Sequence, residues 1–96
     1  MDNLHIEETI KTPGIEFDAR SGVLKITGRA IPENPEDFFA DIIDWIFSYF
    51  KSPKKETVVN IQLEYINSGA SKFILELFHI LEEKYEEGYQ SKINWF

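Results

Sequence analysis

The chain has 96 residues, of which 43% are hydrophobic and 15% aromatic, and its formal net charge at pH 7 is −7. These values are typical of one small globular domain and argue against intrinsic disorder. The absence of cysteine excludes disulfides and cysteine-bound metal sites. The acidic balance disfavours nucleic-acid partners and anionic membranes. Since no secretory signal or membrane-spanning segment is recognisable, we expect a cytoplasmic protein.

The first third of the chain predicts three short strands. Residues 4–10 and 15–17 read as the first two, and residues 23–29 as the third. A turn over residues 18–22 separates the last two, and Gly22 suits the positive φ that such a turn needs. Together these segments predict an antiparallel hairpin or meander.

The next segment predicts a helix that starts at Asn34–Pro35 and runs to about Lys51. Asparagine is a good helix cap, and proline fits the first helical position. Apolar residues follow at the spacing of one buried helical face. These residues are Phe39, Ile42, Ile43, Ile46 and Phe50.

The second half of the chain predicts a strand, a helix and a final strand. Residues 57–65 alternate, which places Val59, Ile61, Leu63 and Tyr65 on one face. The helix is expected from about Ala70 to Glu86, before a last strand over residues 92–96. The predicted buried stripe of this helix is Ala70, Ile74, Leu77, Phe78, Leu81 and Tyr85. The order β-β-β-α-β-α-β indicates an α/β fold, with a mixed sheet packed against two helices.

Two serines lie where the predicted turn after residue 65 enters the second helix. Ser68 and Ser71 would be near unpaired backbone N–H groups and the positive end of the helix dipole. A phosphate on one of them would be stabilised there and would change an exposed surface. Asn67 or Ser68 could equally be a plain helix cap, and local chemistry alone favours that simpler interpretation.

Aromatic residues form a second stripe on the first helix. Phe38, Trp45 and Tyr49 are spaced i, i+7 and i+11. This stripe is either a wide core contact or a surface that docks a partner. The two histidines have no ligand-spaced companions, and no catalytic triad or phosphate-binding glycine loop is recognisable. We therefore expect no metal, no cofactor and no enzymatic activity.

The order of elements resembles the STAS domains of anti-sigma-factor antagonists. The chain more closely resembles the SiaC-type family of bacterial regulatory phosphoproteins. The motifs that carry this resemblance are Leu4-His5-Ile6, Thr12-Pro13, Pro32-Glu33-Asn34, Ile43-Asp44-Trp45, Leu63-Glu64-Tyr65-Ile66-Asn67-Ser68 and Asn94-Trp95. They span essentially the whole chain, so residues 1–96 are expected to form a single STAS-like domain.

The resemblance implies a phosphorylation switch. In this family a Thr or Ser directly after a Tyr-x-Asn element is phosphorylated by a dedicated protein kinase, and a PP2C-type phosphatase reverses the mark. The unmodified form binds a signalling partner, in one branch a diguanylate cyclase. Carried onto this chain, the phosphoacceptor is Ser68, with Ser71 as second candidate, and the partner surface includes Tyr65, Asn67 and Gly69. Relatives continue past the last strand, so a C-terminal helix is expected to be missing after Phe96.

Two other classes of function remain open. One is a small-molecule or nucleotide-binding domain that holds a ligand anion at the start of the second helix. The other is a structural domain that forms a homodimer through the aromatic residues of the first helix or through the last strand.

Overall fold

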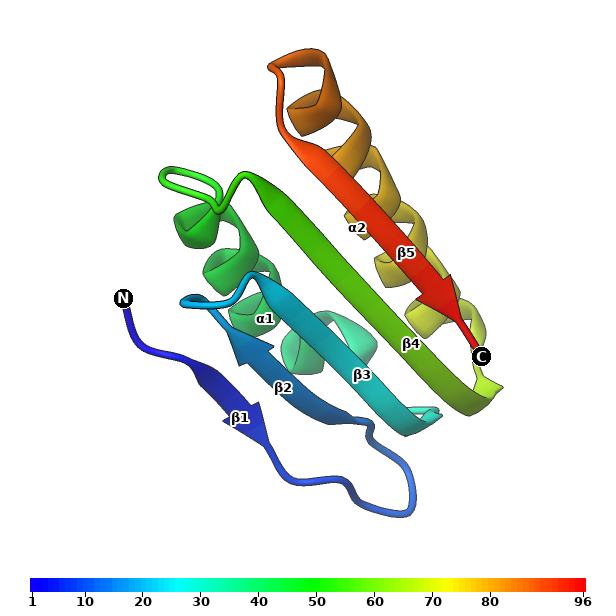
Figure 1. Cartoon of the computed structure of the whole chain (residues 1–96). Coiled ribbons are helices and arrows are strands. Elements are labelled where there is room, and N and C mark those ends of the chain that lie inside the picture. The colour runs from blue at the N-terminus through cyan, green and yellow to red at the C-terminus, as the bar shows by residue number, and fades with distance from the viewer.

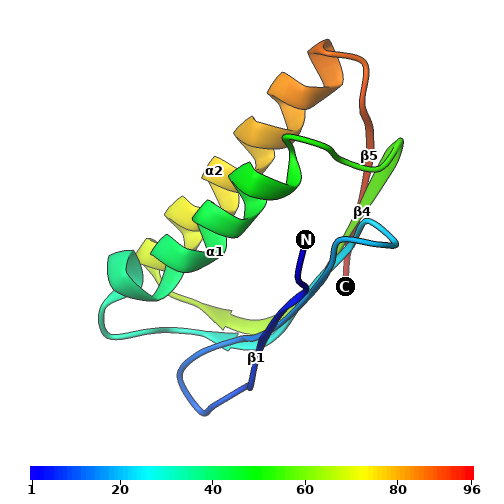
Figure 2. The same cartoon turned by 90° about the vertical axis from the view of Figure 1, so that its left-hand side faces the viewer.

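The computed structural model describes residues 1–96 and contains one five-stranded sheet with two helices on the same face (Figure 1). Figure 2 shows the sheet edge-on, with α1 and α2 side by side on one side and the opposite face open. The elements are β1 (Leu4–Ile6), β2 (Gly14–Asp18), β3 (Val23–Ala30), α1 (Pro35–Tyr49), β4 (Glu56–Ile66), α2 (Ser68–Glu86) and β5 (Gln90–Trp95). The predicted order and mixed α/β class are confirmed. Neither helix combines the length and apolar character that crossing a bilayer requires.

The strands lie in the sheet in the order in which they occur in the chain. β1–β2 and β2–β3 are antiparallel, whereas β3–β4 and β4–β5 are parallel. A parallel pair needs a long crossover, and α1 and α2 provide the two crossovers here. The carboxyl ends of β3 and β4 therefore lie at the same edge of the sheet, where both helices begin.

The core lies between the sheet and the two helices and contains 18 buried hydrophobic residues. Phe39 of α1 and Phe73 of α2 join the helices through stacked rings whose centroids are 4.1 Å apart. Tyr49 is 1% exposed, and its hydroxyl lies 2.9 Å from the Thr57 hydroxyl and accepts a 3.2 Å hydrogen bond from the Lys54 backbone N–H. Every buried side-chain polar atom has a hydrogen-bond partner.

The first strand is shorter than predicted and ends at Ile6 instead of residue 10. The Thr9 hydroxyl accepts hydrogen bonds from the backbone N–H groups of Thr12 at 2.9 Å and Lys11 at 3.2 Å. A side chain that captures these donors favours a turn over a strand ladder. Ile10 is consequently 74% exposed.

Both helices differ from the prediction at their ends. The first ends at Tyr49, and the second begins at Ser68. On the second helix Phe73 and Ile80 are buried, whereas Tyr85 is 62% exposed. The predicted burial of Tyr85 is therefore wrong.

A β-bulge moves Tyr65 away from its predicted face. Gly28 of β3 pairs with Leu63, but the next residue, Arg29, pairs with Tyr65, so Glu64 is an extra residue in β4. An extra residue reverses the alternation of side chains beyond it. Tyr65 is therefore 57% exposed on the open face of the sheet instead of sharing the core face with Val59 and Ile61.

Candidate functional site

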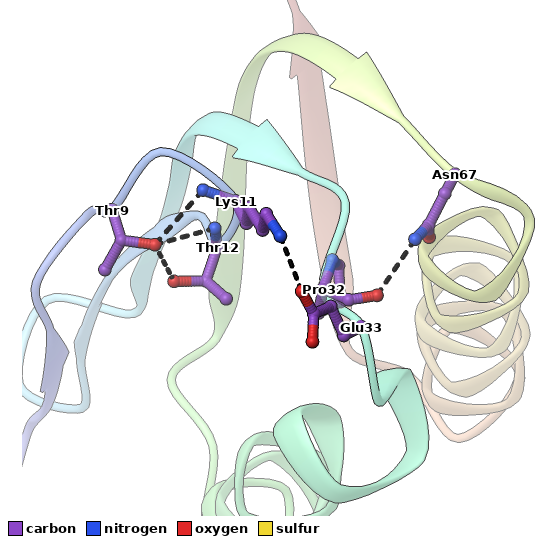
Figure 3. Close-up of polar contacts among 6 residues, drawn as sticks. All are labelled: Thr9, Lys11, Thr12, Pro32, Glu33 and Asn67. Atoms are coloured by element: carbon purple, nitrogen blue, oxygen red, sulfur yellow. Dashed lines mark hydrogen bonds and ion pairs between the residues drawn. The ribbon is translucent and has the colours of Figure 1, made fainter.

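The candidate site lies at the sheet edge where β3 and β4 end. Figure 3 shows the loop over residues 9–12, the loop over residues 31–34 and Asn67 close together there. Ligand sites in open parallel sheets commonly lie outside the carboxyl ends of the strands. The backbone N–H of Ile31 donates a 2.9 Å hydrogen bond to the carbonyl of Lys11, and the N–H of Asn67 donates one of 3.0 Å to the carbonyl of Ala30. Three separate stretches of chain are thus tied together beside the start of α2.

Asn67 is the residue that caps α2. Its side-chain oxygen accepts a 2.9 Å hydrogen bond from the Ala70 N–H, which satisfies one free donor of the first helical turn. Its side-chain nitrogen donates a 3.0 Å hydrogen bond to the carbonyl of Pro32 (Figure 3). Because both ends of the amide are engaged, Asn67 also fixes the loop that leads into α1 against the start of α2.

Ser68 is the first residue of α2, and it is exposed. Its hydroxyl makes no hydrogen bond within the protein, since Asn67 provides the cap. The sequence left open whether Asn67 or Ser68 caps the helix. The structure shows that Asn67 is the cap, and the Ser68 hydroxyl is therefore accessible. Ser71 is exposed one turn along the helix, so exposure alone does not separate the two serines.

Gly69 lies against Pro35, the first residue of α1. A Cβ atom on Gly69 would lie 2.5 Å from the Cβ of Pro35 and would also overlap its Cγ. The absence of a side chain therefore allows the start of α2 to rest on the proline ring at the start of α1. This contact explains a glycine directly after Ser68 without assigning it a role in partner binding.

The loop residues Lys11 and Glu33 were not among the sequence candidates. The Lys11 ammonium donates a 2.5 Å hydrogen bond to the Glu33 carboxylate, and this bond lowers the pKa of Glu33 (Figure 3). The hydroxyls of Thr9 and Thr12 are 2.5 Å apart in the same loop. Thr9 and Thr12, on either side of Lys11 in the chain, indicate a turn. The position of Lys11 beside Glu33, however, depends on long-range packing.

Tyr65 lies outside this cluster, on the open face of the sheet. The Arg29 guanidinium lies 5.4 Å from the centroid of the Tyr65 ring, within the range of a cation–π contact. The Arg29 Nε also donates a 3.4 Å hydrogen bond to Glu64. Tyr65 is thus exposed, as a partner-binding residue must be. It lies on the face of the sheet opposite the two helices.

The aromatic stripe of the first helix is mostly part of the core. Tyr49 is fully buried, so its assignment to a docking surface is wrong. Trp45 is half-buried, stacks on Tyr49 with 5.4 Å between ring centroids, and donates its indole N–H to the Asp2 carbonyl at 2.9 Å. Phe38 is half-buried and contacts Phe39 edge to face. The wide core contact is therefore the interpretation that the packing favours for this stripe.

A groove between α1 and α2 starts at Ser68 and Gly69. Its volume is about 750 Å³. Besides those two residues, the lining consists of Asn34, Pro35, Glu36, Phe39, Ala40, Ile43, Asp44, Lys72, Phe73 and Glu76. No group of three or more His, Cys, Asp or Glu side chains is arranged to hold a metal ion. This groove thus adjoins the candidate phosphoacceptor.

A model of the SiaC family of regulatory phosphoproteins matches residues 6–96. The chain belongs to the SiaC family. An uncharacterized protein of Pseudomonas aeruginosa strain UCBPP-PA14 is 30% identical over 95 residues, which are 99% of this chain and 75% of that protein. This chain is therefore assigned to a family of regulatory phosphoproteins.

Solved structures of relatives share the fold. Apo-SiaC of P. aeruginosa is 29% identical, and the match has a TM-score of 0.94 over 99% of this chain and 78% of that chain. The structure of the diguanylate cyclase SiaD in complex with its activator SiaC, also from P. aeruginosa, matches at a TM-score of 0.90 and 29% identity over 96% of this chain and 75% of that chain. The five-stranded sheet with two helices is thus the arrangement found in SiaC structures.

Proposed function

We propose that this SiaC-family chain is a protein-binding regulator without catalytic activity of its own, switched by phosphorylation of Ser68. The family resemblance selects Ser68 over Ser71, because Ser68 directly follows Tyr65-Ile66-Asn67. One observation supports this choice: Asn67 provides the helix cap, so the adjacent Ser68 hydroxyl is exposed and makes no hydrogen bond within the protein. A phosphate at the first position of α2 is favoured by the helix dipole. In addition, the loops around Ser68 are held by hydrogen bonds, which gives a kinase and a partner a well-defined surface.

The partner that we propose is a diguanylate cyclase, which the unmodified chain would bind. The support is the relative: SiaC of P. aeruginosa is described as the activator of the diguanylate cyclase SiaD and forms a complex with it. The family resemblance adds a dedicated protein kinase and a PP2C-type phosphatase as the enzymes that write and erase the mark. All of these partners meet the chain at Ser68 or on the surface around it.

Peptide mapping by mass spectrometry tests the site of modification. The chain is co-expressed with its proposed dedicated protein kinase, and the kinase is shown separately to be active. We expect a single phosphate on Ser68, no phosphate in Ser68→Ala and unchanged phosphorylation in Ser71→Ala, the matched exposed serine one turn away. An unmodified chain, or phosphate on Ser71 only, would refute the assignment.

Binding measurements test the switch itself. Ser68→Ala should bind the cyclase whether or not the kinase is present, whereas Ser68→Asp should bind it poorly. Equal binding by the unmodified and the phosphorylated chain would reduce Ser68 to a surface residue without a regulatory role.

Self-association is a second candidate, favoured by the β5 edge. Ile93, Trp95 and Phe96 are 41%, 51% and 72% exposed, and β5 has no neighbour on its outer side. Exposed apolar groups on an edge strand are a common basis for pairing between chains. If this edge forms a homodimer, sedimentation velocity will show concentration-dependent size that Trp95→Ser abolishes and Trp45→Ala leaves intact. A nucleotide ligand is less well supported, because carboxylates dominate the charged lining of the groove beside Ser68.

A further inference from the structure

The floor of the groove between α1 and α2 is aromatic. Phe39 and Phe73 stack there with 9° between their ring planes, and they are 5% and 4% exposed. Ala40, whose side chain is small, and Ile43 line the same groove from α1. Phe47, 50% exposed, follows Ile43 by one helical turn on the same side of α1. An apolar strip thus runs along α1 and is only partly covered.

The rim of the groove is acidic. Glu36 and Asp44 of α1 and Glu76 of α2 line it, and Lys72 is the only cation among the lining residues. None of these four side chains makes an ion pair within the protein, because all five ion pairs involve other residues. The rim charges are therefore available to a partner of opposite charge.

The walls of the groove favour a helical occupant. Both walls are α-helices, whose backbone N–H and C=O groups are bonded within the helix. An extended peptide in this groove would find no backbone partners, whereas a helix satisfies its own. An amphipathic helix in an apolar groove is also a common mode of recognition between proteins.

We propose that this groove docks a basic amphipathic helix of the partner protein. An apolar side chain of that helix lies above Phe39 and Phe73, next to Ala40. Lysine or arginine side chains beside it contact Glu36, Asp44 and Glu76. The inference rests on the proposed function, since it names the surface and the chemistry through which a regulator with Ser68 as its switch holds its target.

Ser68 and Lys72 connect this groove to the switch. Both line the groove, and they are neighbours one turn apart on α2. Charge alone would make a phosphate on Ser68 attract a basic helix more strongly, so release requires that the phosphate take up space. A phosphate that pairs with Lys72 lies across the end of the groove and excludes the apolar side chain. Lys72 is thus the positioning residue for the phosphate.

Titration of the ¹⁵N-labelled full chain with two synthetic helical peptides tests the docking site. The peptides share the same leucine positions, and one carries lysine and arginine where the other carries glutamate. We expect the basic peptide, up to millimolar concentration, to shift the amide resonances of Ala40, Ile43 and Phe73, and the acidic peptide to leave them unchanged. Equal effects of both peptides, no binding, or shifts confined to β5 or the open sheet face would overturn the proposal.

Variants give the matched controls. Ala40→Leu enlarges a side chain that lines the groove and should weaken the basic peptide about tenfold or more, as loss of one buried apolar anchor does. Glu76→Gln should weaken it about two- to fivefold, the range of an exposed ion pair. Glu86→Gln, which makes the same charge change outside the groove, should have no effect. A loss of affinity as large in Glu86→Gln as in Glu76→Gln would show that only net charge matters and would refute the site.

Phosphorylated protein tests the role of Lys72. With a phosphate on Ser68, the chain should bind the basic peptide about tenfold more weakly. In the phosphorylated Lys72→Gln variant most of the lost affinity should return. Unchanged binding after phosphorylation, or a loss that persists in Lys72→Gln, would refute the proposed link. Phosphate on Ser68 with an empty groove would overturn this inference and leave the proposed switch intact. If the peptide binds in the groove but Ser68 is never phosphorylated, the proposed switch is overturned and the docking site stands.

Discussion

Gly69→Ala tests whether the contact between the two helix starts is as tight as described. In most helices alanine stabilises relative to glycine by about 0.5–1 kcal/mol. Here the added Cβ would lie 2.5 Å from the Cβ of Pro35, whereas ordinary contacts begin at 3.4 Å, so one helix must move by the difference of 0.9 Å or more. The proline ring is rigid and cannot rotate out of the way.

The expected result is a net loss of stability. Overpacking of this kind costs about 1–3 kcal/mol, which offsets the gain in helix propensity and leaves a loss of up to about 2.5 kcal/mol. For a domain of this size that corresponds to a fall in Tm of up to about 20 °C. Thermal and urea unfolding, followed by far-UV circular dichroism, measure it.

A double-mutant cycle separates this clash from other effects. In a Pro35→Gly background the ring is gone, so Gly69→Ala should become neutral or stabilising, with a coupling energy of about 1–3 kcal/mol. Ser71→Ala, an exposed change on the same helix, serves as the control and should be neutral or slightly stabilising. A rise in Tm for Gly69→Ala that is the same with and without Pro35 would refute the reasoning.

Three further changes should be informative. Asn67→Ala should lower the free energy of unfolding by about 1–2 kcal/mol in urea titrations, whereas Asn34→Ala should cost well under 1 kcal/mol, because Asn34 caps α1 without a side-chain hydrogen bond to the helix backbone. Tyr49→Phe should cost about 1–2 kcal/mol in the same assay, since it leaves a buried threonine hydroxyl without its partner; an unchanged midpoint would contradict that hydrogen bond. Glu7 and then Glu16 raise the pKa of His5, so the contribution of His5 to stability is present in acid and is lost as the pH rises through that pKa. NMR titration should therefore find the His5 pKa above its ordinary value, and Glu7→Gln should bring it down.

Local signals predicted the elements that depend on a few neighbouring residues. Asn34 and Pro35 marked the start of α1 within one residue, because a cap and a fixed φ act within a single turn. The resemblance drew attention to Ser68, and Asn67 was already one of two candidate caps. What the sequence left undecided was which of the two residues uses its side chain for capping.

The errors have non-local causes. The bulge at Glu64 depends on how β4 pairs with β3, and it moved Tyr65 to the open face. Helical spacing placed Tyr49 on the same stripe as Phe38 and Trp45, yet it is buried with its hydroxyl bonded to Thr57, a residue of another element. The groove also could not be predicted, because it requires the relative placement of two helices separated by a strand.

The agreement between strand order and chain order has a consequence for folding. Each strand pairs with the strand that precedes it in the chain, so no strand has to insert between two that are already paired. Only the antiparallel pairs β1–β2 and β2–β3 join nearby residues, and such local pairing forms faster than the parallel pairs that span a helix. During synthesis the β2–β3 hairpin can form first, and each later helix and strand can add to a sheet that already exists. β5 adds last, after α2 has emerged, so the groove and its serine are in place before the sheet is complete.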